Sequence, residues 1–239
     1  MATCFQFALS NPVPGQEEEF NRWYGTDHLI HGVLTPGILA GQRFRRVEGP
    51  WPSGKHDYLT IWEMDDPAFA LAELAKARGT DTMPISPSVD MSTVQPPTMW
   101  RRATVRTAAR IATDTSERRT IVLMLANAAA GEGEGFEGVL LRGGLAELAD
   151  LPAVLSAELL TLADQQIRGS AKKYAYAVLL ELHDEGEGVA SLAERVPALP
   201  HLDRERWLAV VFRPIGHRLT TSEARRAGAE HRSAGAENG

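Results

Sequence analysis

Cysteine is almost absent from this chain of 239 residues, which contains only Cys4. A single cysteine excludes an intramolecular disulfide and a metal cluster built on cysteine thiolates. Long apolar runs are also missing, because no stretch approaches the roughly 18 apolar residues of a membrane-spanning helix. The first residues, MATCFQFALS, have no basic region and alternate as a strand does, so they do not resemble a signal peptide. We therefore expect a cytoplasmic protein without a membrane partner.

Basic charge is scarce as well. The 25 Lys and Arg residues are outnumbered by 31 Asp and Glu residues, which gives a net charge of −6, and the basic residues are dispersed along the chain. This balance argues against nucleic acid as a partner. Hydrophobic residues make up 44% of the chain, which is enough to bury one large core or two ordinary ones.

Runs rich in β-branched and aromatic residues predict strands, and helical spacing of apolar residues predicts the segments between them. In the first half, we expect strands at 3–9, 40–47, 57–64 and 100–106, and helices at 16–31 and 67–78. In the second half, we expect strands at 120–127, 154–162, 174–182 and 206–213, and helices at 132–148 and 188–196. Each half therefore follows the order β-α-β-β-α-β of a ferredoxin-like unit.

The two halves also match each other directly, which indicates a tandem duplication. A shift of 116 positions aligns Asn11, Gly15, Glu18, Phe20, Leu29 and Pro36 with Asn127, Gly131, Glu134, Phe136, Leu145 and Pro152. After a slip of two residues, Tyr58, Glu63 and Asp66 align with Tyr176, Glu181 and Asp184. A four-stranded sheet with helices on one face leaves its other face bare, so two such units can pack sheet to sheet within one chain.

The predicted fold is therefore an α+β barrel made of two tandem ferredoxin-like units. We expect one unit at residues 1–115, a second, degenerate unit at 116–219 and a disordered tail at 220–239. The segment 79–99 is rich in Pro, Ser and Thr and is too long for a simple connector. It can be a lid over a site or a solvated excursion.

The stretch from Glu19 to Phe44 resembles the signature of the EthD-like proteins of the dimeric α+β barrel superfamily. The residues that carry the resemblance are Glu19-Phe20, Trp23-Tyr24, His28-Leu29, Pro36-Gly37, Arg43-Phe44 and the pair Trp62-Glu63 in "YLTIWEMDDP". The resemblance implies the ferredoxin-like fold and a diverse chemistry that includes cofactor-free cyclases, monooxygenases, isomerases and decarboxylases, with haem enzymes in distant branches. Where relatives commonly have Pro and then an acid after His-Leu, this chain has Ile30 and His31.

The candidate catalytic residues are His28, Asp27 and His31. We expect a cofactor-independent enzyme in which proton transfer by His28, oriented by Asp27 or His31, drives a cyclisation, isomerisation, dehydration or decarboxylation. On a wheel of about 100° per residue with Phe20 at the centre of the buried face, Asp27 and His31 fall on that face and His28 lies at its edge. Asp27 and His31 are four residues apart, so the acid can orient the ring of a general base. The alternative is that His31 simply caps the C-terminus of the helix.

We expect the substrate to be a small, largely apolar molecule held in the barrel interior, with aromatic and polyketide-like molecules as candidate classes. Trp23, Tyr24 and Trp62 would form the walls, and Arg43 would hold a carboxylate or an enolate oxygen. No cofactor is expected, and no metal, because His28 and His31 lack a third ligand. Alternatives are a non-catalytic binding or stress-related protein, and a haem- or oxygen-using enzyme.

The second half lacks the polar residues of the candidate site. Trp23, Tyr24, His28, His31 and Arg43 correspond to Val139, Leu140, Gly144, Glu147 and Leu159. The second half keeps the apolar residues expected to pack in the core but lacks the polar and aromatic residues of the candidate site. We therefore expect the first half to carry the active site. A chain that closes its own barrel can still pair through its outer surfaces, and we expect a homodimer.

Overall fold

The structure is a computed structural model that describes residues 4–108, 118–167 and 173–226. The expected repeat boundary at 115–116 lies outside these residues. The first repeat contains β1 (Cys4–Ser10), α1 (Glu17–Trp23), η1 (Tyr24–His28), α2 (Leu29–Leu34), β2 (Ile38–Val47), β3 (Tyr58–Met64), α3 (Pro67–Ala77) and β4 (Thr98–Arg106). The second contains β5 (Thr120–Ala128), α5 (Gly133–Val139), η2 (Leu140–Gly144), α6 (Leu145–Ala149), β6 (Val154–Leu162), β7 (Tyr176–Leu182), α7 (Glu185–Leu192) and β8 (Leu202–Pro214). The predicted β-α-β-β-α-β order is confirmed in both.

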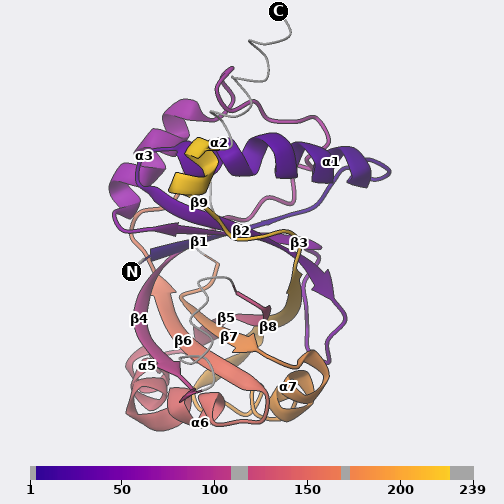
Figure 1. The fold of residues 1–239 in the computed structure, drawn as a ribbon. Coiled ribbons are helices and arrows are strands. Elements are labelled where there is room, and N and C mark those ends of the chain that lie inside the picture. The colour runs from indigo at the N-terminus through magenta and orange to yellow at the C-terminus, as the bar shows by residue number, and fades with distance from the viewer. Residues whose placement is uncertain (1–3, 109–117, 168–172, 227–239) are drawn as a thin grey trace, which may run out of the picture.

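All described strand pairs are antiparallel and form one sheet in the order β3-β1-β4-β6-β7-β5-β8-β2. A further pairing of β2 with β3 joins the two ends of this series, so the sheet closes into a barrel. Within each repeat the strand order is that of a ferredoxin-like unit, and the repeats meet at β4–β6 and β2–β8. The helices of the first repeat cover one side of the barrel and those of the second repeat cover the opposite side (Figure 1). The predicted α+β barrel of two ferredoxin-like units is thus confirmed.

The identities between the repeats mark shared structural devices. The side chain of Asn11 donates to the carbonyl of Lys55 and accepts from the amide of Asp57. Its counterpart Asn127 makes the same two hydrogen bonds with Lys173 and Ala175, each 118 positions further along than its equivalent. At the end of the first strand of each repeat, the side-chain amide of the Asn takes the place of a strand backbone as hydrogen-bond partner. The duplication found in the sequence therefore extends to single hydrogen bonds.

Helix starts are shared in the same way. Asp66 caps α3 by accepting a hydrogen bond from the amide of Phe69, and Pro67 follows at the first turn, where a proline costs no hydrogen bond. Asp184 caps α7 with the amide of Glu187. An Asp whose side chain accepts from the amide three residues later is a common N-terminal cap of a helix. The cap at Asp184 explains why α7 begins at Glu185, three residues before the expected start at 188.

The interior of the barrel is a solid core, which corrects our expectation of a substrate there. Inward-facing strand positions carry large apolar side chains, including Phe5, Phe7, Leu9, Phe44, Ile121, Leu123, Leu125 and Phe212. Buried charge fills part of the remaining space, because Glu158 pairs with Arg101 at 2.7 Å and with Arg118 at 2.8 Å. Burial raises the pKa of Glu158, but the two guanidinium groups, that of Arg118 first, outweigh it and hold this pKa below its usual range.

The expected disordered tail is wrong for its first residues. Leu219–Thr220 form β9, which pairs with Gly41 and Ala40 of β2, and residues 221–226 form a short helix. The physical reason is that β8 pairs with β2 only from Phe44 to Val47, so the start of β2 offers free backbone groups on that side. The helix buries Ala224 completely. Residues 227–239 lie outside the described part of the chain.

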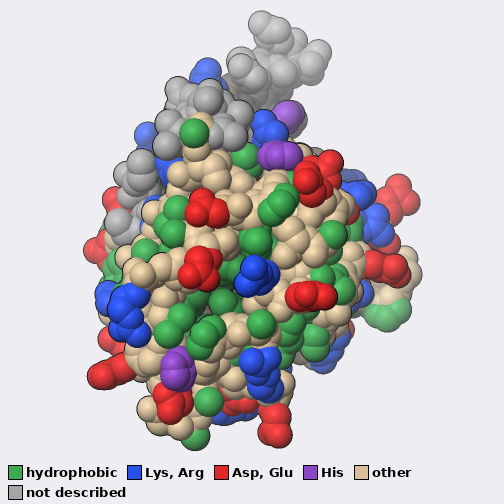
Figure 2. Space-filling model, turned by 90° about the horizontal axis from the view of Figure 1, so that it is seen from below, with side chains coloured by type: hydrophobic (Ala, Val, Ile, Leu, Met, Phe, Trp, Pro, Cys, Tyr) green, Lys and Arg blue, Asp and Glu red, His purple; other side chains and the backbone are tan. Residues whose placement is uncertain are grey.

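Among the described residues, no helix has the length and apolar character needed to cross a membrane. Figure 2 shows the face of the barrel that α5, α6 and α7 cover. Among the described residues that this view shows, acidic and basic side chains are interspersed.

Candidate functional site

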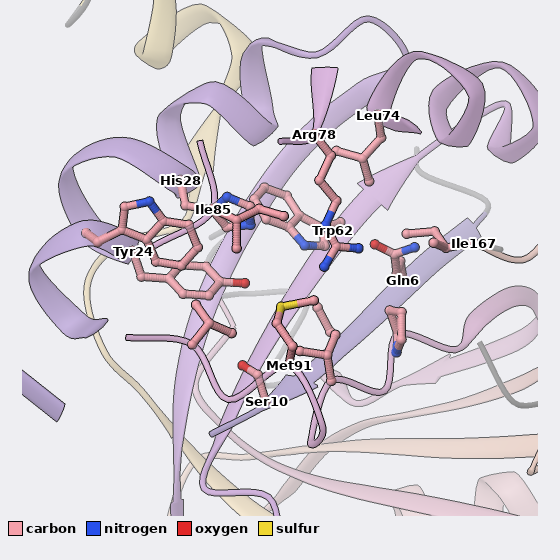
Figure 3. A pocket seen from close by; sticks show the side chains of 15 residues that line it. Gln6, Ser10, Tyr24, His28, Trp62, Leu74, Arg78, Ile85, Met91 and Ile167 are labelled. Carbon is pink, nitrogen blue, oxygen red and sulfur yellow. The ribbon is translucent and has the colours of Figure 1, made fainter. Parts of the chain in front are cut away.

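A cavity of about 60 Å³ lies between the helix-covered face of the first repeat's sheet and its helices (Figure 3). Residues from both repeats line it. These are Gln6, Ala8 and Ser10 of β1; Trp23, Tyr24 and His28 of α1 and η1; Trp62 of β3; Leu74 and Arg78 at the end of α3; and Ile85, Val89, Met91, Val94, Pro96 and Ile167. We call it the aromatic pocket. Because strand side chains alternate, this face is opposite to the one that fills the barrel.

The segment between α3 and β4 covers this pocket with five apolar side chains, so it is not a solvated excursion. It is fixed at several points. The indole nitrogen of Trp23 donates to the carbonyl of Pro84 at 3.3 Å, and isolated bridges join Val89 to Pro12 and Gln95 to Leu9. The cavity has room for a few water molecules only, so a ring-sized ligand requires this cover to move.

A π-helical turn, η1, decides which side chains reach the pocket. A π-turn contains one more residue than an α-turn. Every residue after it therefore points in the direction that the preceding residue would take on a regular α-helix, which rotates its side chain about the helix axis by about 100°. This rotation carries His28 from the edge of the wheel to the centre of the buried face. It also carries Asp27 outward and His31 toward the edge. The second repeat has the same device, η2, at the equivalent positions.

Three aromatic rings enclose His28. Its imidazole stacks on the indole of Trp23, with ring centres 4.5 Å apart and planes inclined by 23°. Tyr24 and Trp62 stand nearly perpendicular to it, with ring centres at 4.8 and 6.0 Å. The Nδ1 atom of His28 is buried and has no hydrogen-bond partner among the described residues. One ring nitrogen of this pocket-lining side chain is therefore buried without a hydrogen-bond partner among the described residues.

Burial lowers the pKa of His28 to about 3, and the positive charges of Arg78, Arg43 and His31 act in the same direction. Desolvation disfavours the charged imidazolium, and nearby cations disfavour it further. His28 is therefore neutral at neutral pH. In this form it has a lone pair to accept a proton and no extra proton to deliver, so the pocket excludes the general-acid role, while the lowered pKa makes His28 a weak base as long as the pocket is empty.

The structure does not bring Asp27 and His31 to this pocket. Asp27 accepts a hydrogen bond from the hydroxyl of Thr26 and makes none with either histidine in the part of the chain that is described. His31 lines a separate surface groove between the end of α2 and α3, together with Glu73 and Lys76. The expected Asp-His contact on one helix face is therefore wrong, because the wheel assumed a regular α-helix through Tyr24–His28.

Arg43 is also displaced from its expected place. It is 5% exposed and does not line the aromatic pocket. Its guanidinium lies 4.2 Å from the ring centre of Tyr24 and donates to the side-chain oxygen of Asn21 at 2.9 Å. Burial lowers its pKa. The residue supports the inner wall of the pocket through Tyr24, while Trp23, Tyr24 and Trp62 line the pocket itself.

Sequence reasoning missed three polar residues of the pocket, namely Arg78, Gln6 and Ser10. Gln6 and Ser10 alternate with Phe5, Phe7 and Leu9 on β1, so their polarity on a strand buried on both faces was the available signal. Arg78 ends α3 immediately before Gly79, which has a positive φ of 80°. Its place at the end of a helix, directly before the segment 79–99 that could cover a site, was the available indication that Arg78 lines a pocket.

The equivalent space in the second repeat is filled. The counterparts of Gln6, Ala8, Ser10, Tyr24, Trp62, Leu74 and Arg78 are Val122, Met124, Ala126, Leu140, Leu180, Leu192 and Val196, and all belong to one buried apolar cluster. A single hydrophobic core thus occupies the volume that corresponds to the pocket.

The described residues contain no group of three or more His, Cys, Asp or Glu side chains placed to hold a metal ion. Haem, which the resemblance raises through distant branches, does not fit the site either. The rings of Trp23, Tyr24 and Trp62 stand around the imidazole of His28, where a porphyrin plane would have to lie.

Comparison with known proteins agrees with this architecture. No family model matches the chain, and no curated protein matches it in sequence. Among solved structures, an anthrone oxidase-like protein is similar with a TM-score of 0.60 and 11% identity over 93% of this chain and 94% of that one. A protein of Fusobacterium nucleatum provisionally assigned as a monooxygenase has a TM-score of 0.58 and 8% identity over 90% and 94%.

The chlorite dismutase of Candidatus Nitrospira defluvii has a TM-score of 0.52 and 11% identity over 89% of this chain and 91% of that one. At these identities the likeness concerns the fold alone. Because nine-tenths of each chain is covered, it extends across both repeats. The protein therefore has the dimeric α+β barrel fold, with both halves of the barrel in one chain.

Proposed function

We propose that the aromatic pocket is the active site of an enzyme that removes a proton from an aromatic or polyketide-like small molecule, with His28 as the general base. The observation that carries the proposal is a neutral imidazole with an unpartnered nitrogen, enclosed by aromatic rings and facing a cavity whose lining has Arg78 as its cation. An apolar wall selects a ring, and the positive charges of Arg78 and Arg43 near His28 favour negative charge on the bound substrate.

The proposed step is balanced without a cofactor. The bond between an acidic ring carbon and its hydrogen breaks, the proton moves to His28, and the electron pair remains on the substrate as an enolate. The new negative charge offsets the nearby cations, so the imidazolium becomes more favourable as the anion forms. Return of the proton to another carbon gives an isomer or prepares a cyclisation. The same anion is the form in which an anthrone reacts with dioxygen to give an anthraquinone and water.

Two further observations support this proposal. Four residues distinguish the pocket from its filled counterpart, namely Trp23, Tyr24, His28 and Trp62. All four are among the residues that carry the resemblance to EthD-like proteins. The name of one structural neighbour, anthrone oxidase-like protein, also points to a ring with an acidic carbon. Asp27 and His31 have no part in the proposal, because neither lines the aromatic pocket.

Deuterium exchange tests the proposal without knowledge of the natural substrate. Anthrone carries an acidic methylene group, and its exchange in D₂O under anaerobic conditions can be followed by proton NMR. We expect the protein to accelerate this exchange and the His28→Gln variant to lose about two to four decades of the acceleration, as is typical for loss of a general base.

Gly144→Ala alters the position in the second repeat that is equivalent to His28 and is the matched control; we expect it to leave the exchange rate unchanged. The melting temperature of each variant shows whether it is folded. A folded His28→Gln protein that exchanges anthrone as fast as the wild type would refute the role of His28. Tight binding without exchange in the wild type would instead identify a non-catalytic binding protein.

A further inference from the structure

Arg78 stands between two cavities. Besides the aromatic pocket, it lines a groove of about 470 Å³, and the two cavities share Leu74, Arg78 and Ile167. In Figure 3, the guanidinium of Arg78 points from the end of α3 toward Trp62 and Gln6, near Ile167. A molecule that reaches the pocket along the groove must therefore pass this side chain.

The groove lies between the two repeats. One wall is α3, with the small side chains of Ala68, Ala72 and Ala75, and the other is the segment 164–167 after β6. Gln166 fixes this second wall, because its side chain donates to the carbonyls of Thr98 and Ala163 and accepts from the amide of Thr98. The groove is thus shaped by a rigid contact between β4 and the second repeat.

The guanidinium of Arg78 has no ion pair or hydrogen bond with any residue that the structure describes, whereas Arg101, Arg118 and Arg218 are each paired with a glutamate. Arg78 is only partly exposed, and the surrounding pocket is apolar. A half-buried cation without a partner attracts an anion, and the planar guanidinium matches a carboxylate with two parallel hydrogen bonds.

We propose that the ligand of this site is an aromatic monocarboxylate, with its ring among Trp23, His28 and Trp62 and its carboxylate on Arg78 at the mouth of the groove. This inference rests on the proposed function for the identity of the pocket. A single negative charge is favoured because Arg78 is the cation of the pocket lining and Asp164 of the groove repels further negative charge. Any remaining part of the ligand lies along the alanine face of α3.

The pairing also bears on catalysis. The charge of Arg78 is one of the causes that lower the pKa of His28, together with burial, Arg43 and His31. A carboxylate on Arg78 cancels that charge next to the imidazole. The correct substrate therefore makes His28 a stronger base than it is in the empty pocket, whereas a neutral analogue does not.

Calorimetric titration with two ligands of nearly equal shape tests this inference. The anion 2-naphthoate and the neutral 2-naphthamide differ in charge but share the same ring. We expect the wild type to bind 2-naphthoate at least about tenfold more tightly, as a charge-assisted pair allows. The Arg78→Gln variant should bind both ligands equally, and Arg78→Lys should keep part of the preference, because an ammonium group cannot form the bidentate pair.

Lys76→Gln removes an exposed cation of the same helix and is the matched control; it should keep the full preference. Failure of 2-naphthoate to bind, equal binding of both ligands to the wild type, or a preference that survives in Arg78→Gln would overturn the inference. His28→Gln separates this result from the proposed function, since it should retain the carboxylate preference while losing anthrone exchange. Loss of exchange and loss of preference are thus independent outcomes.

Discussion

At the scale of single residues, burial rather than hydrogen bonding determines the chemistry of His28. Its imidazole is stacked on Trp23 and surrounded by rings, and its Nδ1 atom lacks a partner among the described residues. An imidazolium in this place would lose its hydration and gain no acceptor in return. The protein therefore tolerates protonation of this residue poorly, and this has a measurable consequence for stability.

Between pH 6.5 and about 3, the unfolded chain binds a proton at His28 that the folded protein does not bind. The free energy of unfolding must then fall as the pH is lowered through this window. We expect the wild type to lose on the order of 3 kcal/mol more than His28→Gln between pH 7 and pH 4. Urea denaturation at a series of pH values measures the difference.

The same substitution at His183, an exposed histidine, is the matched control for this measurement. It should leave the pH dependence of unfolding as in the wild type. If His28→Gln and the wild type lose stability in parallel as the pH falls, His28 is protonated in the folded protein. Its role as a neutral base would then have to be abandoned.

At the scale of elements, the η1 turn and the indole of Trp62 shape the pocket together. A Cβ atom on Gly32 of α2 would lie 2.3 Å from Cη2 of Trp62, and one on Gly41 of β2 would lie 2.9 Å from Cζ3. Trp62 thus fills the space that two glycines leave, and its ring forms a wall of the aromatic pocket. Without Cβ atoms at these two positions, α2 can approach β3 closely enough to hold the indole.

We expect Gly32→Ala to destabilise the protein by about 1–3 kcal/mol and to abolish ligand binding, because the new methyl group pushes the indole into the cavity. The gain in helix propensity, about 1 kcal/mol, is too small to offset the clash. Gly25→Ala is the matched control in the same helix, since no atom lies within 4 Å of its Cβ position. Thermal melting and calorimetric titration check both variants; equal behaviour of the two would contradict this account of the wall.

The elements themselves were predictable and the site was only partly so. Alternation on the strands, the caps at Asp66 and Asp184 and the 116-residue register all follow local rules, so they identify the fold. The π-turn at Tyr24–His28 does not change the spacing of apolar residues in the sequence, so that spacing could not reveal it. The rotation that it causes places His28 at the centre of the buried face, where His31 was expected, and moves His31 to the edge. Arg78 and Ile167 meet only through the packing of α3 against the second repeat, which no local pattern reports.

At the scale of the whole molecule, barrel closure removes the usual reason for association. In a chain with one ferredoxin-like unit, the bare sheet face requires a partner, but here the second repeat covers it. Exposed apolar side chains remain elsewhere: Leu34 is 37% exposed and Leu39 is 36% exposed, on either side of the turn at Gly37. Phe69, which contacts that turn, is 49% exposed.

We propose that the protein is a homodimer that associates through its outer helical surface at this turn. Light scattering coupled to size exclusion should give twice the mass of one chain at micromolar concentration. Phe69→Glu should halve that mass with little effect on the melting temperature, because the side chain is already half exposed. A wild-type protein that elutes as a monomer would rule out the dimer, and a dimeric Phe69→Glu variant would place the contact elsewhere.

The pairing of β2 with β8 has a consequence for synthesis of the chain. Val47 of β2 lies opposite Val211, near the end of β8, so the barrel can close only after the ribosome has added residue 211. Until then the first repeat presents the apolar face of Phe5, Phe7 and Phe44 to the cell. A nascent chain in this state exposes apolar surface that favours aggregation until β8 has been made and can pair with β2.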